Sequence, residues 1–417
     1  MATPACLRGG TRRIAMLFGV ALMVGALATP ANADDWAQFG YDAGQTRVNP
    51  NEDVISRENV DTLDVAWDAT RRIDGIPLTP PLVGGGGVFV GGTNEAGTKV
   101  ILWSLSEATG RIRWRTEPGC DAIEDDALRS MALADGILLV SLRRCEPDSS
   151  SLGFFDADTG ALIRFIRFEG VGMSSPTISR GSVYVFSSHD DGADQLNRID
   201  LLTGEFIWRS SVRDEYDGGQ STIMAATHRM LAISPNFASS FSPIISRGVI
   251  YAGGEHDFVD PRTGGPIPDP LSGPCLPQEL CAYDAETGGQ LWRRFGGAPV
   301  VHGGLAYAAC DYRRFCALDE TTAFAAWYID APGRNTSFLP YRPGSRPILA
   351  NDLVYVGLRN ARTGRHRLLI LEATETHGAS RIEATVSSGR DFVVVNGTVY
   401  TSGKDVKLRA YRPVAQP

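Results

Sequence analysis

Two short histidine-containing runs carry side chains that could hold a metal ion. His189-Asp190-Asp191 and Glu255-His256-Asp257 each place carboxylates beside an imidazole. Carboxylate oxygens suit calcium, whereas imidazole nitrogens suit transition metals. Neither run has the spacing of an EF-hand or an HExxH motif, so a solvated surface loop is the alternative. These six residues are metal-ligand candidates, and no catalytic residue can be assigned from a motif.

Three arginines form a second candidate site. Arg129, Arg346 and Arg390 each stand at the opening of a short apolar strand. If these strands line a central channel, their guanidinium groups would form a pocket for carboxylates or phosphates by bidentate pairing. Arg346 is one place out of step, and such an offset turns a strand residue to the other face, so we expect it to be the weakest of the three. The alternative is local pairing with acidic neighbours such as Asp391 and Asp126.

The cysteines suggest a disulfide framework. Seven occur in the chain, and six of them follow residue 33. An even number of cysteines in an exported chain favours disulfides over free thiols or zinc. All six map to long loops on one face of the expected fold, where buried free thiols are the alternative. The economical pairing is Cys120–Cys145, Cys275–Cys281 and Cys310–Cys316.

A repeated motif indicates the elements that must position these groups. Its shape is small-x-Asp-x-x-Thr-Gly-x-x-x-Trp, and residues 281–292, CAYDAETGGQLW, contain Asp284, Thr287, Gly288 and Trp292. The Asp side chain caps a tight turn, and Gly tolerates a positive φ there. The motif therefore predicts a strand, a turn and a strand that carries Trp. Related copies end at Trp114, Trp208 and Trp327.

A hairpin pattern precedes each copy, as in SSPTISRGSVYVFSS from Ser174, so one unit is four antiparallel strands. The Trp or its equivalent falls at 114, 164, 208, 292, 327 and roughly 381. Four-stranded units repeating at this interval predict an all-β propeller. Seven hairpin openings predict seven blades, with a Pro/Gly-rich insertion loop at about 253–280. Eight blades are the alternative, with 221–234 in a degenerate blade.

The two ends of the chain are expected to share a blade. The last hairpin opening, at Arg390, ends in KLRAYRP without a following Trp strand. The missing strand occurs at the other end of the chain as LDVAWDA, which carries Trp67. An N-terminal strand that completes the last blade would close the ring and remove exposed sheet edges.

The first 33 residues have the features of an export signal. Arg8, Arg12 and Arg13 precede an apolar run at 14–28, and Ala31-Asn32-Ala33 is typical of a cleavage site. We expect a signal peptide at 1–33, cleavage after Ala33, and one propeller domain at 34–417. The formal net charge of −8 would become −11 on loss of three arginines. An acidic, secreted or cell-envelope protein of this kind is a poor candidate for nucleic-acid binding, and no later segment is apolar enough to span a bilayer.

The repeat, together with the opening WAQFGYDAGQTRVNP at 36–50, resembles the PQQ-like β-propeller family of quinoprotein dehydrogenases and exported assembly factors. This resemblance covers nearly the whole chain after the signal and implies the propeller fold. It also implies PQQ and calcium as candidate cofactors. However, the chain lacks the adjacent Cys-Cys pair of the dehydrogenases and is shorter than they are.

The leading functional expectation is a secreted binding or scaffold module. Its partner would be an extracellular or cell-envelope protein, or a small anionic ligand. The alternative, implied by the resemblance, is a PQQ-dependent oxidoreductase acting on an alcohol, sugar or polyol, with the quinone in the channel. The sequence leaves the oligomeric state open.

Overall fold

The computed structural model describes residues 35–414 except 122–127, 147–148, 170–171, 189–193, 213–221, 227–229, 235–243, 247–248, 253–256, 260–265, 268–278, 285–289, 296–298, 312, 320–321, 323, 339–345, 374–381 and 405. The expected signal peptide at 1–33 lies outside the described residues. No helix in the described part is long and apolar enough to cross a membrane.

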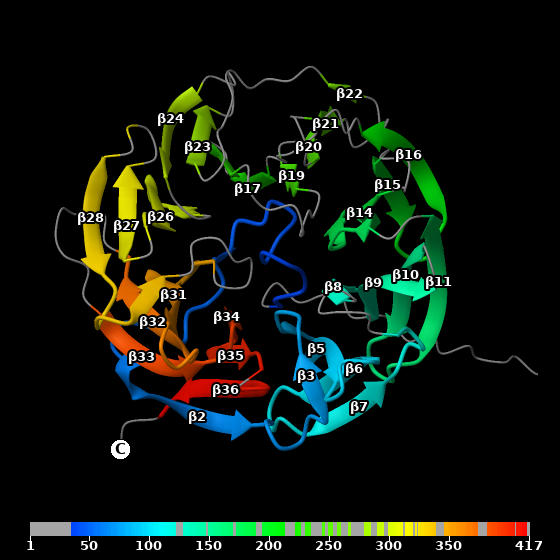
Figure 1. The fold of residues 1–417 in the computed structure, drawn as a ribbon, viewed down its shortest axis with the longest axis horizontal. Helices are drawn as coiled ribbons and strands as arrows, with labels where there is room; N and C mark the ends of the chain where they lie inside the picture. The colour runs from blue at the N-terminus through cyan, green and yellow to red at the C-terminus, as the bar shows by residue number, and fades with distance from the viewer. Residues whose placement is uncertain are drawn as a thin grey trace, which may run out of the picture.

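The described strands form small sheets arranged in a ring (Figure 1). The first three sheets follow one another along the chain. Sheet one contains β3 (Gly75–Pro77), β4 (Leu82–Gly84), β5 (Gly87–Asn94), β6 (Val100–Ser106) and β7 (Ile112–Thr116). Sheet two contains β8 (Leu128–Ala134), β9 (Ile137–Glu146), β10 (Ser149–Asp156) and β11 (Leu162–Glu169). Sheet three contains β12 (Gly172–Met173), β13 (Thr177–Ser179), β14 (Ser182–Ser188), β15 (Asp194–Asp200) and β16 (Phe206–Val212).

Two further sheets are nested in sequence. One contains β17 (Thr222–Ala226), β18 (Met230–Ser234), β23 (Glu279–Asp284) and β24 (Gln290–Phe295). Between its two halves, the chain forms a separate sheet of β19 (Ile244–Ser246), β20 (Val249–Ala252), β21 (Asp257–Val259) and β22 (Pro266–Ile267).

Three sheets complete the ring. The first contains β25 (Val300–His302), β26 (Leu305–Ala309), β27 (Arg314–Asp319) and β28 (Ala325–Asp330). The next contains β29 (Thr336–Phe338), β30 (Ile348–Ala350), β31 (Leu353–Asn360), β32 (His366–Glu372) and β33 (Ile382–Ser388), joined by β1 (Val48–Asn49). The last contains β2 (Leu63–Asp68), which follows the 3-10 turn Val60–Thr62, with β34 (Asp391–Val395), β35 (Thr398–Ser402) and β36 (Leu408–Pro413).

The number of sheets differs from the main expectation. The described strands form eight sheets, which matches the alternative of eight blades rather than the prediction of seven. The difference arises at 222–295, where strands β21 and β22 lie inside the expected insertion loop and pair with each other. The sequence signal was present, because Asp260-Pro-Arg-Thr-Gly264 is another copy of the turn motif. Its Pro and Gly residues suggested a loop instead.

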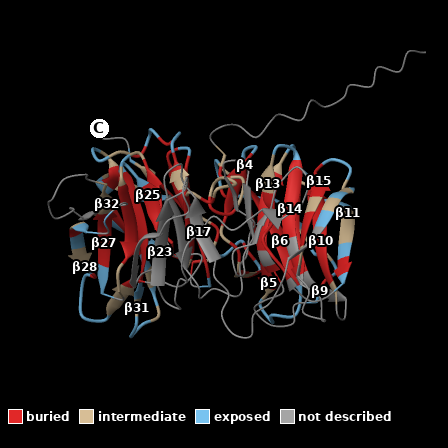
Figure 2. Cartoon of the chain, turned by 90° about the horizontal axis from the view of Figure 1, so that it is seen from above, coloured by how far each residue is buried: buried red, intermediate tan, exposed pale blue. Residues whose placement is uncertain are grey.

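Burial explains the strand compositions. Strands β26 and β34 are buried along their whole length because a neighbouring sheet covers each face. Such strands are continuously apolar rather than alternating. The outer strand β28 is largely exposed, with Trp327 as its one buried residue. Figure 2 shows the same contrast, with buried residues in the inner strands and exposed residues in the turns and on β11 and β28.

The repeated turn joins the second sheet to the first. In the turn after β10, Asp156 Oδ1 accepts hydrogen bonds from Thr159 N (2.8 Å) and Thr159 Oγ1 (2.7 Å). Trp114, on the preceding sheet, donates from Nε1 to Ala157 O over 2.8 Å. Gly160 has a φ of +71°, and a Cβ there would lie 2.6 Å from the Trp114 ring. The motif therefore pairs Gly with the Trp of the neighbouring copy.

The other motif tryptophans fit this pattern to different degrees. Trp67 and Trp327 are buried, whereas Trp208 is half-buried beside Tyr184. In sheet two, Arg164 stands where Trp is expected and donates through Nη2 to Leu202 O in the next turn over 2.8 Å. Asp284 lies in β23 and Trp292 in β24, but their side chains are not described. Thr287 and Gly288 lie outside the described residues.

The ring is closed by strands from the two ends of the chain, as the sequence predicts. Strand β2 pairs antiparallel with β36 from Leu63↔Pro413 to Asp68↔Arg409. Figure 1 shows β2 in blue beside β36 in red. The Arg409 guanidinium donates from Nε to Asp68 Oδ2 over 3.0 Å.

Residues 35–52, which we call the N-terminal strap, cross the centre of the ring before β2 (Figure 1). Trp36 forms a bridge with Val83 of the first sheet, and Gln38 with Ala132 of the second. Gln38 Oε1 also accepts a hydrogen bond from Ile178 N of the third sheet over 2.8 Å. Strand β1 then pairs in parallel with β30. The strap thus links the innermost strands of several sheets.

Candidate functional site

The strap and two inner strands bring charged side chains together at the ring centre. Arg47 directly precedes β1, Arg346 lies two residues before β30, and Asp391 opens β34. Leu349 N donates to Arg47 O over 3.0 Å, which fixes the strap against β30. Arg47 Nη1 in turn lies 3.5 Å from Arg346 O. We call Phe39, Arg47, Arg346, Arg390 and Asp391 the central cluster.

Phe39 organises the two buried arginines. The guanidinium carbon of Arg47 lies 5.0 Å from the centre of the Phe39 ring, and that of Arg346 lies 5.5 Å from it. All three side chains are buried, with 4% of Arg47 and 5% of Arg346 exposed. The negative face of an aromatic ring attracts a guanidinium, more strongly when water is excluded. One ring therefore holds two cations in a dry environment.

Burial dominates the electrostatics of the cluster. It lowers the pKa of Arg346 to about 10. It also lowers the pKa of Arg47 well below its ordinary value, and the nearby positive charge of Arg346 adds to this effect. Burial raises the pKa of Asp391 to about 6, against the opposing influence of Arg390 and Arg47. The Arg390 Nε atom is 4.0 Å from Asp391 Oδ2.

The structure places the three predicted arginines differently. Arg346 and Arg390 stand at the openings of neighbouring inner strands, while Arg129 lies in β8 with its side chain outside the description. Arg346, expected to be the weakest, is the buried one, and Arg390 is 42% exposed. The alternation argument does not apply to Arg346 because it precedes β30 rather than lying in it. Arg390 does lie beside Asp391, as in the local-pairing alternative.

Arg47 is a member of the cluster that the strand pattern did not reveal. It lies in the strap and has a φ of +58°, outside any repeat unit. A signal was available in the opening WAQFGYDAGQTRVNP, whose single arginine is Arg47.

The metal-ligand candidates are mostly beyond the description. His189, Asp190, Asp191, Glu255 and His256 lie outside the described residues. Asp257 begins β21, with its side chain undescribed. Within the part of the chain that is described, no three His, Cys, Asp or Glu residues gather into a group that could hold a metal ion.

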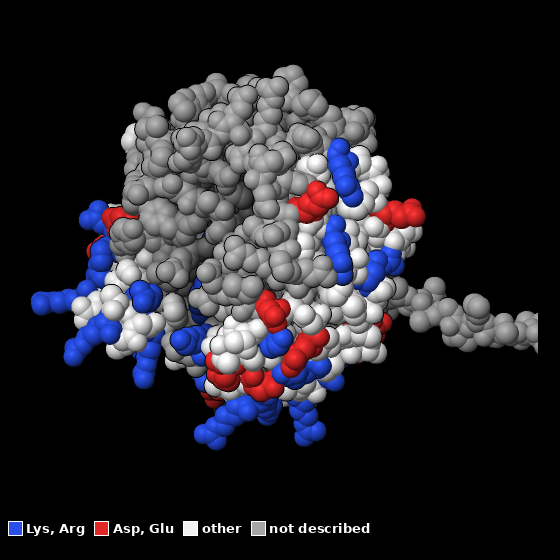
Figure 3. All heavy atoms as spheres, turned by 45° about the vertical axis from the view of Figure 1, so that its right-hand side comes forward, with Lys and Arg blue, Asp and Glu red and all other residues white. Residues whose placement is uncertain are grey.

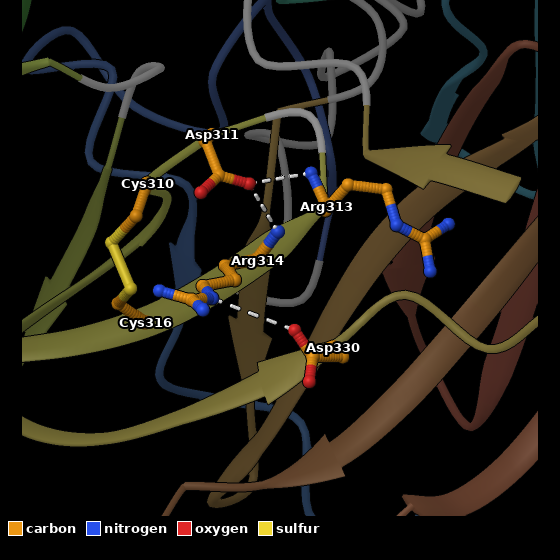
Figure 4. Close-up of a disulfide and its surroundings, with 6 residues drawn as sticks. All are labelled: Cys310, Asp311, Arg313, Arg314, Cys316 and Asp330. Carbon is orange, nitrogen blue, oxygen red and sulfur yellow. Dashed lines mark hydrogen bonds and ion pairs between the residues drawn. A yellow bond between two sulfur atoms is a disulfide. The ribbon is translucent and has the colours of Figure 1, made fainter. Parts of the chain in front are cut away.

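One predicted disulfide is present, between Cys310, which follows β26, and Cys316, which lies in β27 (Figure 4). Cys120 is also disulfide-bonded. Its expected partner Cys145 lies in β9 with its side chain undescribed. The same holds for Cys281 in β23, and Cys275 lies outside the described residues.

Hydrogen bonds fix the loop that this disulfide closes. Asp311 Oδ1 accepts from the backbone nitrogens of Arg313 (2.6 Å) and Arg314 (2.7 Å). Arg314 Nε lies 3.5 Å from Asp330 Oδ1 on β28. Figure 4 shows the Arg313 side chain pointing away from Asp311. The loop is thus tied to its own sheet by a covalent bond and an ion pair.

A protein-family model described as outer membrane protein assembly factor BamB matches residues 100–267 and 276–416. The chain belongs to this family. The match covers most of the chain and confirms the PQQ-like propeller resemblance of the repeat. A search of curated proteins found no match.

Solved structures share the fold of this BamB-family chain at low identity. The quinohemoprotein alcohol dehydrogenase of Comamonas testosteroni has a TM-score of 0.56 and 14% identity, covering 92% of this chain and 82% of its own. A europium-containing methanol dehydrogenase has a TM-score of 0.54 and 12% identity, and the match covers 92% of this chain and 90% of the dehydrogenase. The C-terminal WD40 domain of Sif2 has a TM-score of 0.51 and 8% identity, and the match covers 85% of this chain and 99% of the domain. These likenesses show the propeller fold alone.

The quinone and calcium implied by the dehydrogenase resemblance can be tested against the central cluster. Calcium takes six to eight oxygen ligands, mostly carboxylates and carbonyls. Asp391 is the carboxylate of the cluster, and the positive charges of Arg390 and Arg47 already act on it. The Phe39 ring, a surface on which a planar cofactor could stack, already contacts two guanidinium groups. The described residues of the cluster therefore do not fit a quinone held with calcium.

Proposed function

We propose that the protein is a binding or scaffold propeller of the cell exterior or envelope, with a site for a small anionic ligand at the ring centre. Arg47, Arg346 and Arg390 would bind the ligand. Carboxylates and phosphates match this set, because each guanidinium offers a planar fork of donors. The ligand need not be transformed for this function.

The observation that supports the proposal is the pair of buried guanidinium groups on one aromatic ring. Guanidinium groups form strong charge-assisted hydrogen bonds with anions, and a low-dielectric environment strengthens such interactions. Here Arg346 also acts on Arg47 as a neighbouring like charge. An anion bound to both would offset that repulsion in an environment of low dielectric. Asp391, with its raised pKa, supplies negative charge only when it is ionised.

A PQQ-dependent alcohol, sugar or polyol dehydrogenase is the alternative function. It draws support from the alcohol and methanol dehydrogenases that share the fold. Low identity limits this support to the fold. Because the central cluster does not fit the cofactor with its metal, we prefer the binding function and derive no redox step.

Thermal shift at low ionic strength tests the proposal. Citrate and phosphate should raise the melting temperature in a dose-dependent way, since a ligand that binds only the folded state stabilises it. Added sodium chloride should weaken the effect by screening. The R390Q variant should reduce the shift, because one guanidinium fork is lost from the site. Arg390 is half-exposed, so its replacement need not disturb folding. R180Q, an exposed arginine elsewhere in the ring, is the control.

The same assay distinguishes the two functions. PQQ with calcium, followed by dye-coupled ethanol oxidation, should give no turnover, whether or not PQQ binds to the arginines as a carboxylate. Uptake with turnover would establish the dehydrogenase instead. If citrate, phosphate and PQQ all leave the melting temperature unchanged, the central arginines are structural and the proposed site does not exist.

A further inference from the structure

A second concentration of arginine lies far from the strap, on the hairpin β31–β32. Residues 353–371 contain Arg359, Arg362, Arg365 and Arg367 but no aspartate or glutamate, in a chain of net charge −8. All four arginines are exposed. Figure 3 shows Lys and Arg side chains projecting into solvent on the side of the ring where Figure 1 places these strands. The hairpin is therefore a basic feature on an acidic protein.

The tip of the hairpin has a defined shape. Asn360 Oδ1 accepts hydrogen bonds from Arg362 N (3.0 Å) and Thr363 N (2.9 Å). Gly364, with a φ of +72°, donates from N to Asn360 O over 2.8 Å. These are the bonds of the repeated turn. Arg362 and Arg365 thus project from an ordered backbone, which lowers the entropy lost when they bind a partner.

These side chains are available to a partner. Within the described part of the chain, the guanidinium groups of Arg359, Arg362 and Arg365 form no ion pair or hydrogen bond. By contrast, the nearby Arg57 pairs with Glu372 at 2.6 Å. Arg367 is cross-strand from Leu358, and Arg359 is cross-strand from His366. Neighbouring positions alternate between faces of a strand, so Arg367 points to the other face from Arg359.

The segment that precedes β29 extends this basic region. Ala361 N donates to Asn335 O over 2.7 Å, which places the exposed Arg334 next to the hairpin tip. Strand β29 continues the contact by pairing Ser337 with Arg359. We call Arg334, Arg359, Arg362 and Arg365 the basic ledge.

The disulfide loop holds the other side of this segment. Arg313 donates from Nη1 to Gly333 O over 2.9 Å and from Nη2 to Ala331 O over 3.0 Å. The Cys310–Cys316 bond closes the loop that carries Arg313. Hydrogen bonds to the backbone of 331–336 therefore connect the disulfide loop to the hairpin and fix the ledge across two sheets.

We propose that the basic ledge docks an acidic, extended segment of a partner protein. Arginine forks pair with carboxylates in a fixed geometry, and four of them along two adjacent segments match several Asp or Glu side chains in a row. The large apolar residues exposed in the described chain all lie outside 331–371. A ledge without an apolar anchor favours an acidic peptide over insertion into a lipid surface.

Binding of a labelled decaglutamate peptide, followed by fluorescence anisotropy in 50 mM salt, tests the inference. The triple variant R359Q/R362Q/R365Q should bind at least tenfold more weakly than the unmodified protein. The matched control is R71Q/R111Q/R180Q, which removes the same charge from exposed arginines on other sheets. It should lose less than threefold. Circular dichroism verifies that each variant is folded.

Three outcomes would overturn the proposal. Equal losses in both triple variants would show that the peptide responds to net charge and not to the ledge. Absence of binding by the unmodified protein would show that the ledge does not dock acidic peptides. Ledge-dependent binding to phosphatidylglycerol vesicles, without binding to decaglutamate, would assign the ledge to an anionic lipid surface. None of these results depends on the central cluster.

Discussion

The indole ring of Trp67 occupies the space that a side chain on Gly110 would need. A Cβ on Gly110 would come within 2.5 Å of that ring. Trp67 also donates from Nε1 to Glu107 O over 3.0 Å. Trp67 belongs to the last sheet, and Gly110 belongs to the turn between β6 and β7 of the first sheet. This contact therefore joins the last sheet to the first where the ring closes.

Replacing Gly110 by Ala should therefore destabilise the protein through two effects. The residue has a φ of +62°, and the left-handed conformation costs an L residue about 1–2 kcal/mol. Crowding against the indole should add about 1–3 kcal/mol, as overpacking of a core does. Urea unfolding measures the sum.

Gly97 provides the matched control for this substitution. Its φ is +69°, but nothing lies within 4 Å of its Cβ position. G97A should show the backbone cost alone. Equal losses of stability in G97A and G110A would mean that the Trp67 contact contributes nothing.

Ser402 makes another contact across the closed ring. Its hydroxyl donates to Thr79 O over 3.1 Å, and both residues are buried. S402A should lower the free energy of unfolding by about 1–3 kcal/mol, because Thr79 O would be left buried without this donor.

Ser104 is the opposite case among the buried serines. Its hydroxyl has no hydrogen-bond partner in the described part of the chain. S104A should leave stability unchanged or raise it, since a buried hydroxyl without a partner is unfavourable. A loss in S104A as large as that in S402A would contradict the role given to the Thr79 contact.

Asp391 should make stability depend on pH in mildly acidic solution. Its pKa is raised to about 6 in the folded protein, from an ordinary 3.8, so the folded state holds the proton more tightly than the unfolded state. The associated stability is fully present below about pH 4 and is lost as the pH rises through about 6. It can reach about 3 kcal/mol, because a tenfold change in proton affinity corresponds to about 1.4 kcal/mol.

The D391N variant should lack this component. Its melting temperature relative to the unmodified protein should therefore rise between pH 4 and pH 7. D135N, at an exposed turn between β8 and β9, removes the same charge far from the central cluster and serves as the control for loss of a carboxylate. A constant difference for D391N across this range would show that the Asp391 carboxyl does not titrate there.

The Cys310–Cys316 bond should contribute modestly to stability. It closes a short loop, with a sequence separation of 6, so the chain-entropy model gives about 2 kcal/mol. The C310S/C316S variant should melt a few degrees lower while keeping the far-ultraviolet spectrum of the ring. Alkylation of either cysteine in unreduced native protein would refute the bond.

The sequence reveals most of this fold because the repeat couples local and long-range structure. Asp156, Thr159 and Gly160 form a turn by themselves, and Trp114 packs on that turn from the preceding sheet. One motif thus encodes both the turn and its neighbour. The pairing of β2 with β36 follows from a strand missing at one end and present at the other.

The blade count and the central cluster were harder to predict for physical reasons. The motif copy at 260–264 was obscured by surrounding Pro and Gly residues, which usually indicate loops. Arg47 lies outside any repeat, and its proximity to Arg346 depends on the path of the strap. No local pattern encodes a contact between residues 299 positions apart.

The pairing of Asp68 with Arg409, across 341 residues, bears on the kinetics of folding. Closing a loop of that length costs entropy before any contact is gained, and folding slows as native contacts become less local. Each sheet can form from its own neighbouring strands, but the ring cannot close until the last residues of the chain meet β2. We expect refolding to show a slow final phase that reports on Trp67. A circular permutant that joins residue 414 to residue 35 brings β36 and β2 close in sequence and should shorten that phase.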